Sequence, residues 1–109
     1  MSILNENEID SIAKRNDFVG IELAIADHLE WDDIEFHLAK LQTKIRNYIS
    51  FYINKQYLEV FEDLPSNIER CIIHLYLKHE APDNLDVVFK SISNQLNEYG
   101  IEFIKEVLL

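Results

Sequence analysis

The chain has 109 residues, 48% of them hydrophobic and only four of them glycine or proline, so it is long enough for one compact domain and lacks the composition of a disordered or low-complexity protein. Its 20 acidic and 10 basic residues give a formal charge of −10, which disfavours nucleic acid and anionic membranes as partners and suits a basic protein. With a lone cysteine, no secretory leader pattern and no apolar run near the ~20 residues of a membrane span, we expect a single domain over residues 1–109 in the cytoplasm.

Two segments near the N-terminus alternate in the manner of strands. Residues 8–14 alternate imperfectly, and residues 18–26 place four apolar side chains on one face: Val19, Ile21, Leu23 and Ile25. Asn16 and Asp17 lie between the two segments, where a tight turn needs such residues. The pattern predicts a β-hairpin.

From Trp31 the apolar spacing becomes helical. Six residues recur at intervals of three and four: Ile34, Leu38, Leu41, Ile45, Tyr48 and Tyr52. This stripe predicts a helix of about six turns, and its first turn would hold Asp32, Asp33 and Glu35, where the positive end of the helix dipole favours acids.

The second half of the chain predicts a connection, a strand, a helix and a final strand. Pro65 breaks the pattern over residues 57–67, which we interpret as a connection with a short extended piece. Residues 68–79 are rich in β-branched and aromatic residues, with Cys71, Ile73, Leu75 and Leu77 facing the core and Arg70, His74, Tyr76 and Lys78 facing outward. A turn with an Asp or Asn cap at 81–84 precedes a helix over 85–99, Gly100 ends that helix, and residues 101–109 form the last strand.

The resulting order is β-β-α-β-α-β. The last strand–helix–strand unit suits a parallel crossover, because about 20 residues separate its strands. We therefore predict an α+β fold, a two-layer sandwich in which two helices cover one face of a four-stranded mixed sheet. The other face, with His74 and Tyr76, is left to solvent or to a partner.

No motif in the chain is specific for catalysis or for a cofactor. His28 with Asp32, and His37 with Asp33, have the i, i+4 spacing of metal ligands, yet no HExxH pattern or carboxylate loop accompanies them. Cys71 is expected inside the core as an inert thiol, and the only glycines, Gly20 and Gly100, form no phosphate loop. The sequence thus predicts neither an enzyme nor a bound cofactor or metal.

The stretch DHLEWDDIE, residues 27–35, is the densest polar cluster. The acids of its second half are those expected in the first turn of a helix. Asp27, His28 and Glu30 precede that turn, and a helix start does not require them. Trp31 has two interpretations, because it can pack as a staple at the helix start or serve as an interface anchor.

Residues 25–52 resemble a family of small, mostly uncharacterised bacterial proteins. The likeness rests on a strand ending in DHLEW and on a helix with the family pattern HL..LQ.KIN.Y..F. Its matching residues are Asp27, His28, Leu29, Glu30, Trp31, His37, Leu38, Leu41, Gln42, Lys44, Ile45, Tyr48 and Phe51. Arg46 and Asn47 depart from the family pattern. The resemblance covers residues 8–52 well and implies a fold, but it implies no catalytic residues. A weaker likeness, of general character only, is to bacterial toxin-immunity proteins.

The sequence therefore favours a non-enzymatic, immunity- or antitoxin-like domain that neutralises a basic toxin domain by direct binding. Its expected binding residues are Asp27, His28, Glu30, Trp31, Asp32, Asp33 and Glu35, with Glu59, Glu62 and Asp63 as a second patch. Three alternatives stay open. The charge can serve solubility alone, the chain can be a housekeeping or regulatory domain that forms a homodimer through the open sheet face, and it can be a small metal-assisted enzyme.

Overall fold

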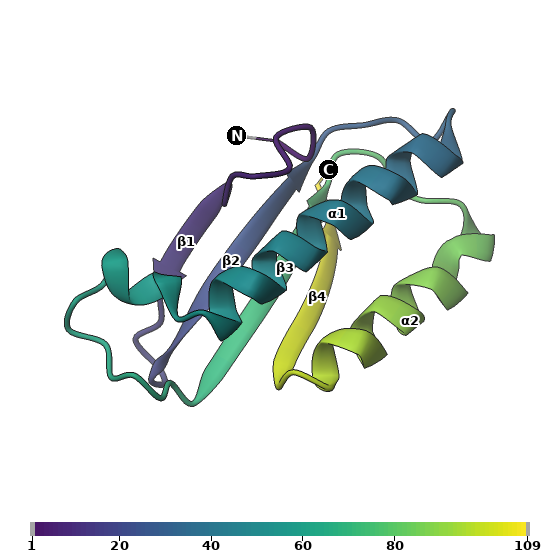
Figure 1. Ribbon diagram of the computed structural model, residues 1–109. Coiled ribbons are helices and arrows are strands. Elements are labelled where there is room, and N and C mark those ends of the chain that lie inside the picture. The colour runs from purple at the N-terminus through teal and green to yellow at the C-terminus, as the bar shows by residue number, and fades with distance from the viewer. Residues whose placement is uncertain (1, 109) are drawn as a thin grey trace.

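The computed structural model describes residues 2–108 and has the predicted α+β architecture (Figure 1). Its strands and α-helices are β1 (Ser11–Lys14), β2 (Gly20–Asp27), α1 (Ile34–Ile53), β3 (Arg70–Leu77), α2 (Asp86–Asn97) and β4 (Ile101–Val107). Two short 3-10 helices, η1 (Gln56–Glu59) and η2 (Asp83–Leu85), complete the chain. Leu109, expected in the last strand, lies outside the described residues.

The strands lie in the order β1-β2-β3-β4. β1 is antiparallel to β2, whereas β2, β3 and β4 are mutually parallel, so the predicted crossover through α2 is confirmed and α1 forms a second one. Both helices cover the same face of the sheet (Figure 1). Because the three parallel strands all end at one edge of the sheet, the loops that lead into α1 and α2 both start there.

The helix boundaries differ from the prediction at the N-terminal ends. Trp31 and Asp32 precede α1, whose N-cap is Asp33, because the Asp33 carboxylate accepts a hydrogen bond from the Phe36 amide at 3.1 Å. The predicted Asp or Asn cap of α2 is wrong, since η2 leads directly into that helix and its N-cap, Leu85, offers no side-chain bond.

The other predictions about where elements end and connect are confirmed, with one exception. Gly100 ends the second helical segment with a φ of 75°, which glycine adopts without strain. The connection over 57–67 contains η1 rather than an extended piece. Neither helix within residues 2–108 has the length and apolar character to cross a membrane.

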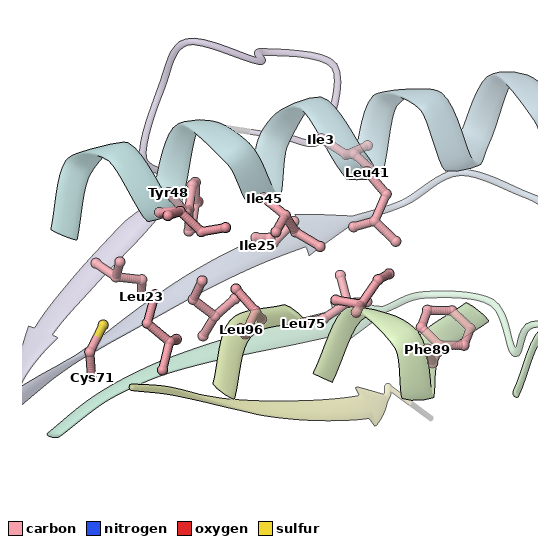
Figure 2. Close-up of a cluster of buried hydrophobic side chains, with 14 of the residues drawn as sticks. Ile3, Leu23, Ile25, Leu41, Ile45, Tyr48, Cys71, Leu75, Phe89 and Leu96 are labelled. Carbon is pink, nitrogen blue, oxygen red and sulfur yellow. The ribbon is translucent and has the colours of Figure 1, made fainter. Parts of the chain in front are cut away.

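The core lies between the helices and the inner face of the sheet (Figure 2). Ile21, Leu23 and Ile25 of β2 and the four predicted inward residues of β3 are buried. On α1 the predicted stripe is only partly right: Leu41, Ile45 and Tyr48 are buried, but Ile34, Leu38 and Tyr52 are half-buried. Two polar residues, His37 and Lys44, occupy the buried face in their place.

Lys44 is fully buried and organises the N-terminal segment. The three N–H groups of its ammonium are shared among four acceptors: the backbone carbonyls of Ser2 at 3.0 Å, Asn5 at 2.6 Å and Glu8 at 2.6 Å, and the Asp10 carboxylate at 2.7 Å. The other oxygen of the Asp10 carboxylate accepts a hydrogen bond from the Ala26 amide at 2.9 Å. One ammonium group therefore ties residues 2–10 to both α1 and the end of β2.

Replacing Lys44 by methionine is expected to lower the free energy of unfolding by about 3 to 5 kcal/mol, because the buried Asp10 carboxylate loses its counter-charge. Lys40 is the matched control. It lies one turn earlier and its Nζ atom pairs with Glu6 at 2.6 Å, but both side chains are about 30% exposed. Lys40→Met should therefore cost about 1 kcal/mol or less. Urea denaturation measures both, and equal losses would contradict the central role of Lys44.

Candidate functional site

The junction between β2 and α1 is built on a buried histidine–aspartate pair. The Nε2 atom of His37 lies 2.6 Å from an Asp27 carboxylate oxygen, and the two side chains are 1% and 0% exposed. The other Asp27 oxygen accepts from the Leu29 amide at 3.1 Å. Asp27 ends β2 and His37 lies in the first turn of α1, so the pair closes the loop between them.

The partners of His37 determine how many protons the ring carries. Its Nδ1 atom faces the Glu30 carbonyl oxygen at 3.1 Å, an atom that can only accept, so Nδ1 carries a proton. Its Nε2 atom faces a carboxylate, which also needs a donor. The hydrogen bond between Nε2 and the Asp27 carboxylate therefore needs a second proton, which lies between these two groups.

Trp31 joins this junction to the loop that leads into α2. Its ring stacks on His37 at a centroid distance of 3.5 Å, its edge contacts Phe89 of α2, and its Nε1 atom donates to the His79 carbonyl at 3.1 Å. The packing interpretation of Trp31 is therefore the one that the structure shows, and the ring is half-buried.

The Trp31 contacts bring two groups of acids to one end of the molecule, which we call the acidic rim. It comprises seven exposed residues: Glu30, Asp32, Asp33 and Glu35 beside α1, and Glu80, Asp83 and Asp86 beside α2. Figure 1 shows that both loops reach this end. None of the seven forms an ion pair with a residue of the described part, 2–108. The acids beside α2 were missed from the sequence.

One predicted binding residue needs correction, and the predicted second patch lies apart from the rim. Asp27 is 2% exposed and engaged by His37, so it holds the loop and cannot itself contact a partner at the surface. The second patch of Glu59, Glu62 and Asp63 lies around η1, beyond the far end of the 20-residue helix α1, and therefore about 30 Å from the rim. Asp63 is also paired with Lys14.

The uncovered face of the sheet holds a second group of polar side chains. His74 stacks on Tyr76 at a centroid distance of 4.0 Å, and its ring nitrogens lie 3.6 Å from a Glu22 oxygen and 3.4 Å from a Glu106 oxygen. Both nitrogens are shielded from solvent, and neither makes a hydrogen bond to a residue of the described part of the chain. As predicted, His74 and Tyr76 face away from the helices.

Comparison with known protein families gives one result for the whole sequence. A family described as a family of unknown function, DUF6572, matches residues 1–108. The chain belongs to this family. The match agrees with the resemblance to an uncharacterised family and extends it to the second half of the chain, and it gives no link to toxin-immunity proteins. No curated protein and no solved structure matches the chain.

Within residues 2–108, no three His, Cys, Asp or Glu side chains are arranged to hold a metal ion. The His37 and Asp33 side chains that had metal-ligand spacing serve other roles, since one pairs with Asp27 and the other caps α1. Cys71 is fully buried, and burial raises the pKa of its thiol to about 12, so it is a thiol and not a thiolate at neutral pH. The geometry around these residues suits structural roles.

The protonation of His37 can be measured directly. In ¹⁵N NMR spectra at neutral pH, both ring nitrogens of His37 should resonate as protonated nitrogens. In Asp27→Asn the amide can donate to Nε2, so that nitrogen should become unprotonated while the Nδ1 bond to the Glu30 carbonyl persists. His28, which is exposed, gives the reference signals in the same spectra. An unprotonated Nε2 in the wild-type protein would contradict the assignment.

Proposed function

We propose that this domain is a non-enzymatic protein-binding module and that the acidic rim docks a basic partner. The observation that carries the proposal is the convergence of seven exposed carboxylates, none of them ion-paired within residues 2–108, from the two loop-to-helix junctions that Trp31 links. Helix starts account for Asp33, which caps α1, and for Glu35 and Asp86 in first turns. They do not account for Glu30, Asp32 and Glu80, which lie outside both helices.

The buried histidine–aspartate pair at the junction favours a binding role over a catalytic one. A general base needs a ring nitrogen that is free to take a proton from substrate. Both nitrogens of His37 are occupied and its side chain is 1% exposed, so the histidine–aspartate pair does not reach a substrate. Its role in the proposal is to hold the loop that leads into the α1 side of the rim.

For the partner, we propose a basic toxin domain that this protein neutralises in the cytoplasm, as an immunity protein or antitoxin does. The formal charge of −10 supports this partner class, because opposite charges raise the association rate and select against acidic surfaces. Neutralisation also needs no catalytic group, only a surface that covers the toxin.

Charge-reversal variants distinguish binding through the rim from an effect of net charge alone. Glu30→Lys/Asp32→Lys/Glu80→Lys should abolish capture of a basic partner from the source lysate, because the complementary potential is inverted. Glu59→Lys/Glu62→Lys/Glu69→Lys is the control, since it alters the net charge equally with exposed residues at the opposite end. The control should retain capture. Equal loss of capture in both variants would show that net charge, not the rim, drives association. If no basic partner is captured and no neighbouring gene encodes a toxin, the proposal is wrong.

A regulatory homodimer is the second candidate function. It is favoured by the uncovered sheet face, on which Ile104 is 42% exposed beside His74 and Leu108 is 50% exposed beside Tyr76. The acidic charge opposes it, because two copies repel each other.

Size-exclusion chromatography with light scattering distinguishes the two candidates. We expect the mass of one chain at low ionic strength. A dimer that Tyr76→Arg converts to monomer would support the regulatory candidate instead, whereas Tyr57→Phe, a change at a buried residue of η1, should leave the mass unchanged.

A further inference from the structure

The uncovered sheet face contains a hollow of about 350 Å³ where β2 and β3 end. It is lined by Ala26, Asp27, His28, Tyr76, Lys78 and Leu108. The hollow forms because Ala26, the neighbour of Tyr76 in the sheet register, offers only a methyl group on this face. Leu108 closes one side, held by the hydrogen bond from its amide to the Leu77 carbonyl at 2.7 Å.

The floor of the hollow is apolar and fixed in place. Tyr76 is braced by its stack on His74, and the Leu108 side chain is 50% exposed, so both present apolar surface to the solvent. The Asp27 carboxylate is directed to His37 and the Leu29 amide, and it exposes no polar surface to the hollow. A preformed apolar depression of this kind suits one large apolar side chain, the usual centre of a protein–protein contact.

The hollow borders the acidic rim. His28 and Glu30 are two residues apart in one loop, and Lys78 and Glu80 are two residues apart in the other, so their Cα atoms lie within about 7 Å. Lys78 adds a positive charge at the border, against seven carboxylates in the rim. A second copy of this acidic chain is a poor occupant for that reason, whereas a segment with basic residues on either side of an apolar one matches both surfaces.

We infer that the hollow is the anchor site for an apolar side chain carried by a basic segment of the partner. This inference rests on the proposed function and adds to it: the rim attracts the partner, and the hollow holds one aromatic or large aliphatic side chain of it. The occupant is thus a lysine- or arginine-rich protein segment with an apolar residue at its centre.

The test uses two synthetic peptides, blocked at both ends, in which six lysines flank a central phenylalanine or a central alanine. The phenylalanine peptide should bind the wild-type protein about tenfold more tightly or better, because burial of the ring adds apolar contact. In NMR spectra it should shift the amide signals of residues 26–30 and 76–80. Ala26→Leu, which fills the hollow, should remove the difference between the peptides, and Leu108→Ala should reduce it.

Ala13→Leu is the matched control, because Ala13 is exposed on the same sheet face of β1, away from the hollow. It should bind both peptides as the wild type does, and circular dichroism checks the fold of every variant. If both peptides bind equally and the rim-reversed variant loses both, the anchor is overturned and the proposed function stands. If neither peptide binds, the anchor and the basic partner fall together.

Discussion

Helix α1 directs two nitrogen-bearing side chains to the interior, and each engages an aspartate that is closed off from water. His37 pairs with Asp27 and Lys44 pairs with Asp10, at 2.6 and 2.7 Å. The two helical residues are seven positions apart, about two turns, so they lie on the same face. Removing one partner leaves a buried charge unpaired, at a cost of several kcal/mol, so the remaining structure at this end of the sheet depends on both pairs.

Both pairs act on the last two residues of β2. Asp27 is itself the end of the strand, and the Asp10 carboxylate accepts from the amide of Ala26. The carbonyl of Ala26 accepts from the Ile3 amide at 2.9 Å, so the N-terminal segment is attached at the same point. The loop that carries Glu30 and Asp32 therefore begins at a strand end that both buried pairs and the N-terminal segment hold in place. Trp31 in turn restrains the loop before α2.

The sequence predicts the elements well because their signals are local. Alternation identifies β2 and β3 and assigns the inward residues of β3, and helical spacing identifies α1 and α2. It fails for the inward face of α1, because an apolar pattern assigns His37 and Lys44 to solvent. Their partners are 10 and 34 residues away in the chain, and only the folded chain shows that each polar side chain meets an opposite charge.

The candidate site was likewise predicted only where its signal is local in the sequence. The acids around Trp31 are visible as a cluster in the sequence, and most of them are exposed as expected. Their union with Glu80, Asp83 and Asp86 depends on the contact between Trp31 and His79, which are 48 residues apart. The burial of Asp27 likewise follows from a tertiary pair. A dense polar stretch therefore separates into one residue that builds the loop and several that the loop displays.

In the proposed complex, the rim and the hollow have complementary roles. Exposed carboxylates lie in a high dielectric, so each adds at most about 1 kcal/mol to affinity, but together they raise the association rate. Slow dissociation depends instead on apolar surface that is desolvated in the complex. At this end of the molecule, Ala26, Tyr76 and Leu108 supply such a surface. A neutralising protein needs both properties, since a rapid encounter without an anchor releases its partner quickly and an anchor without the charge finds it slowly.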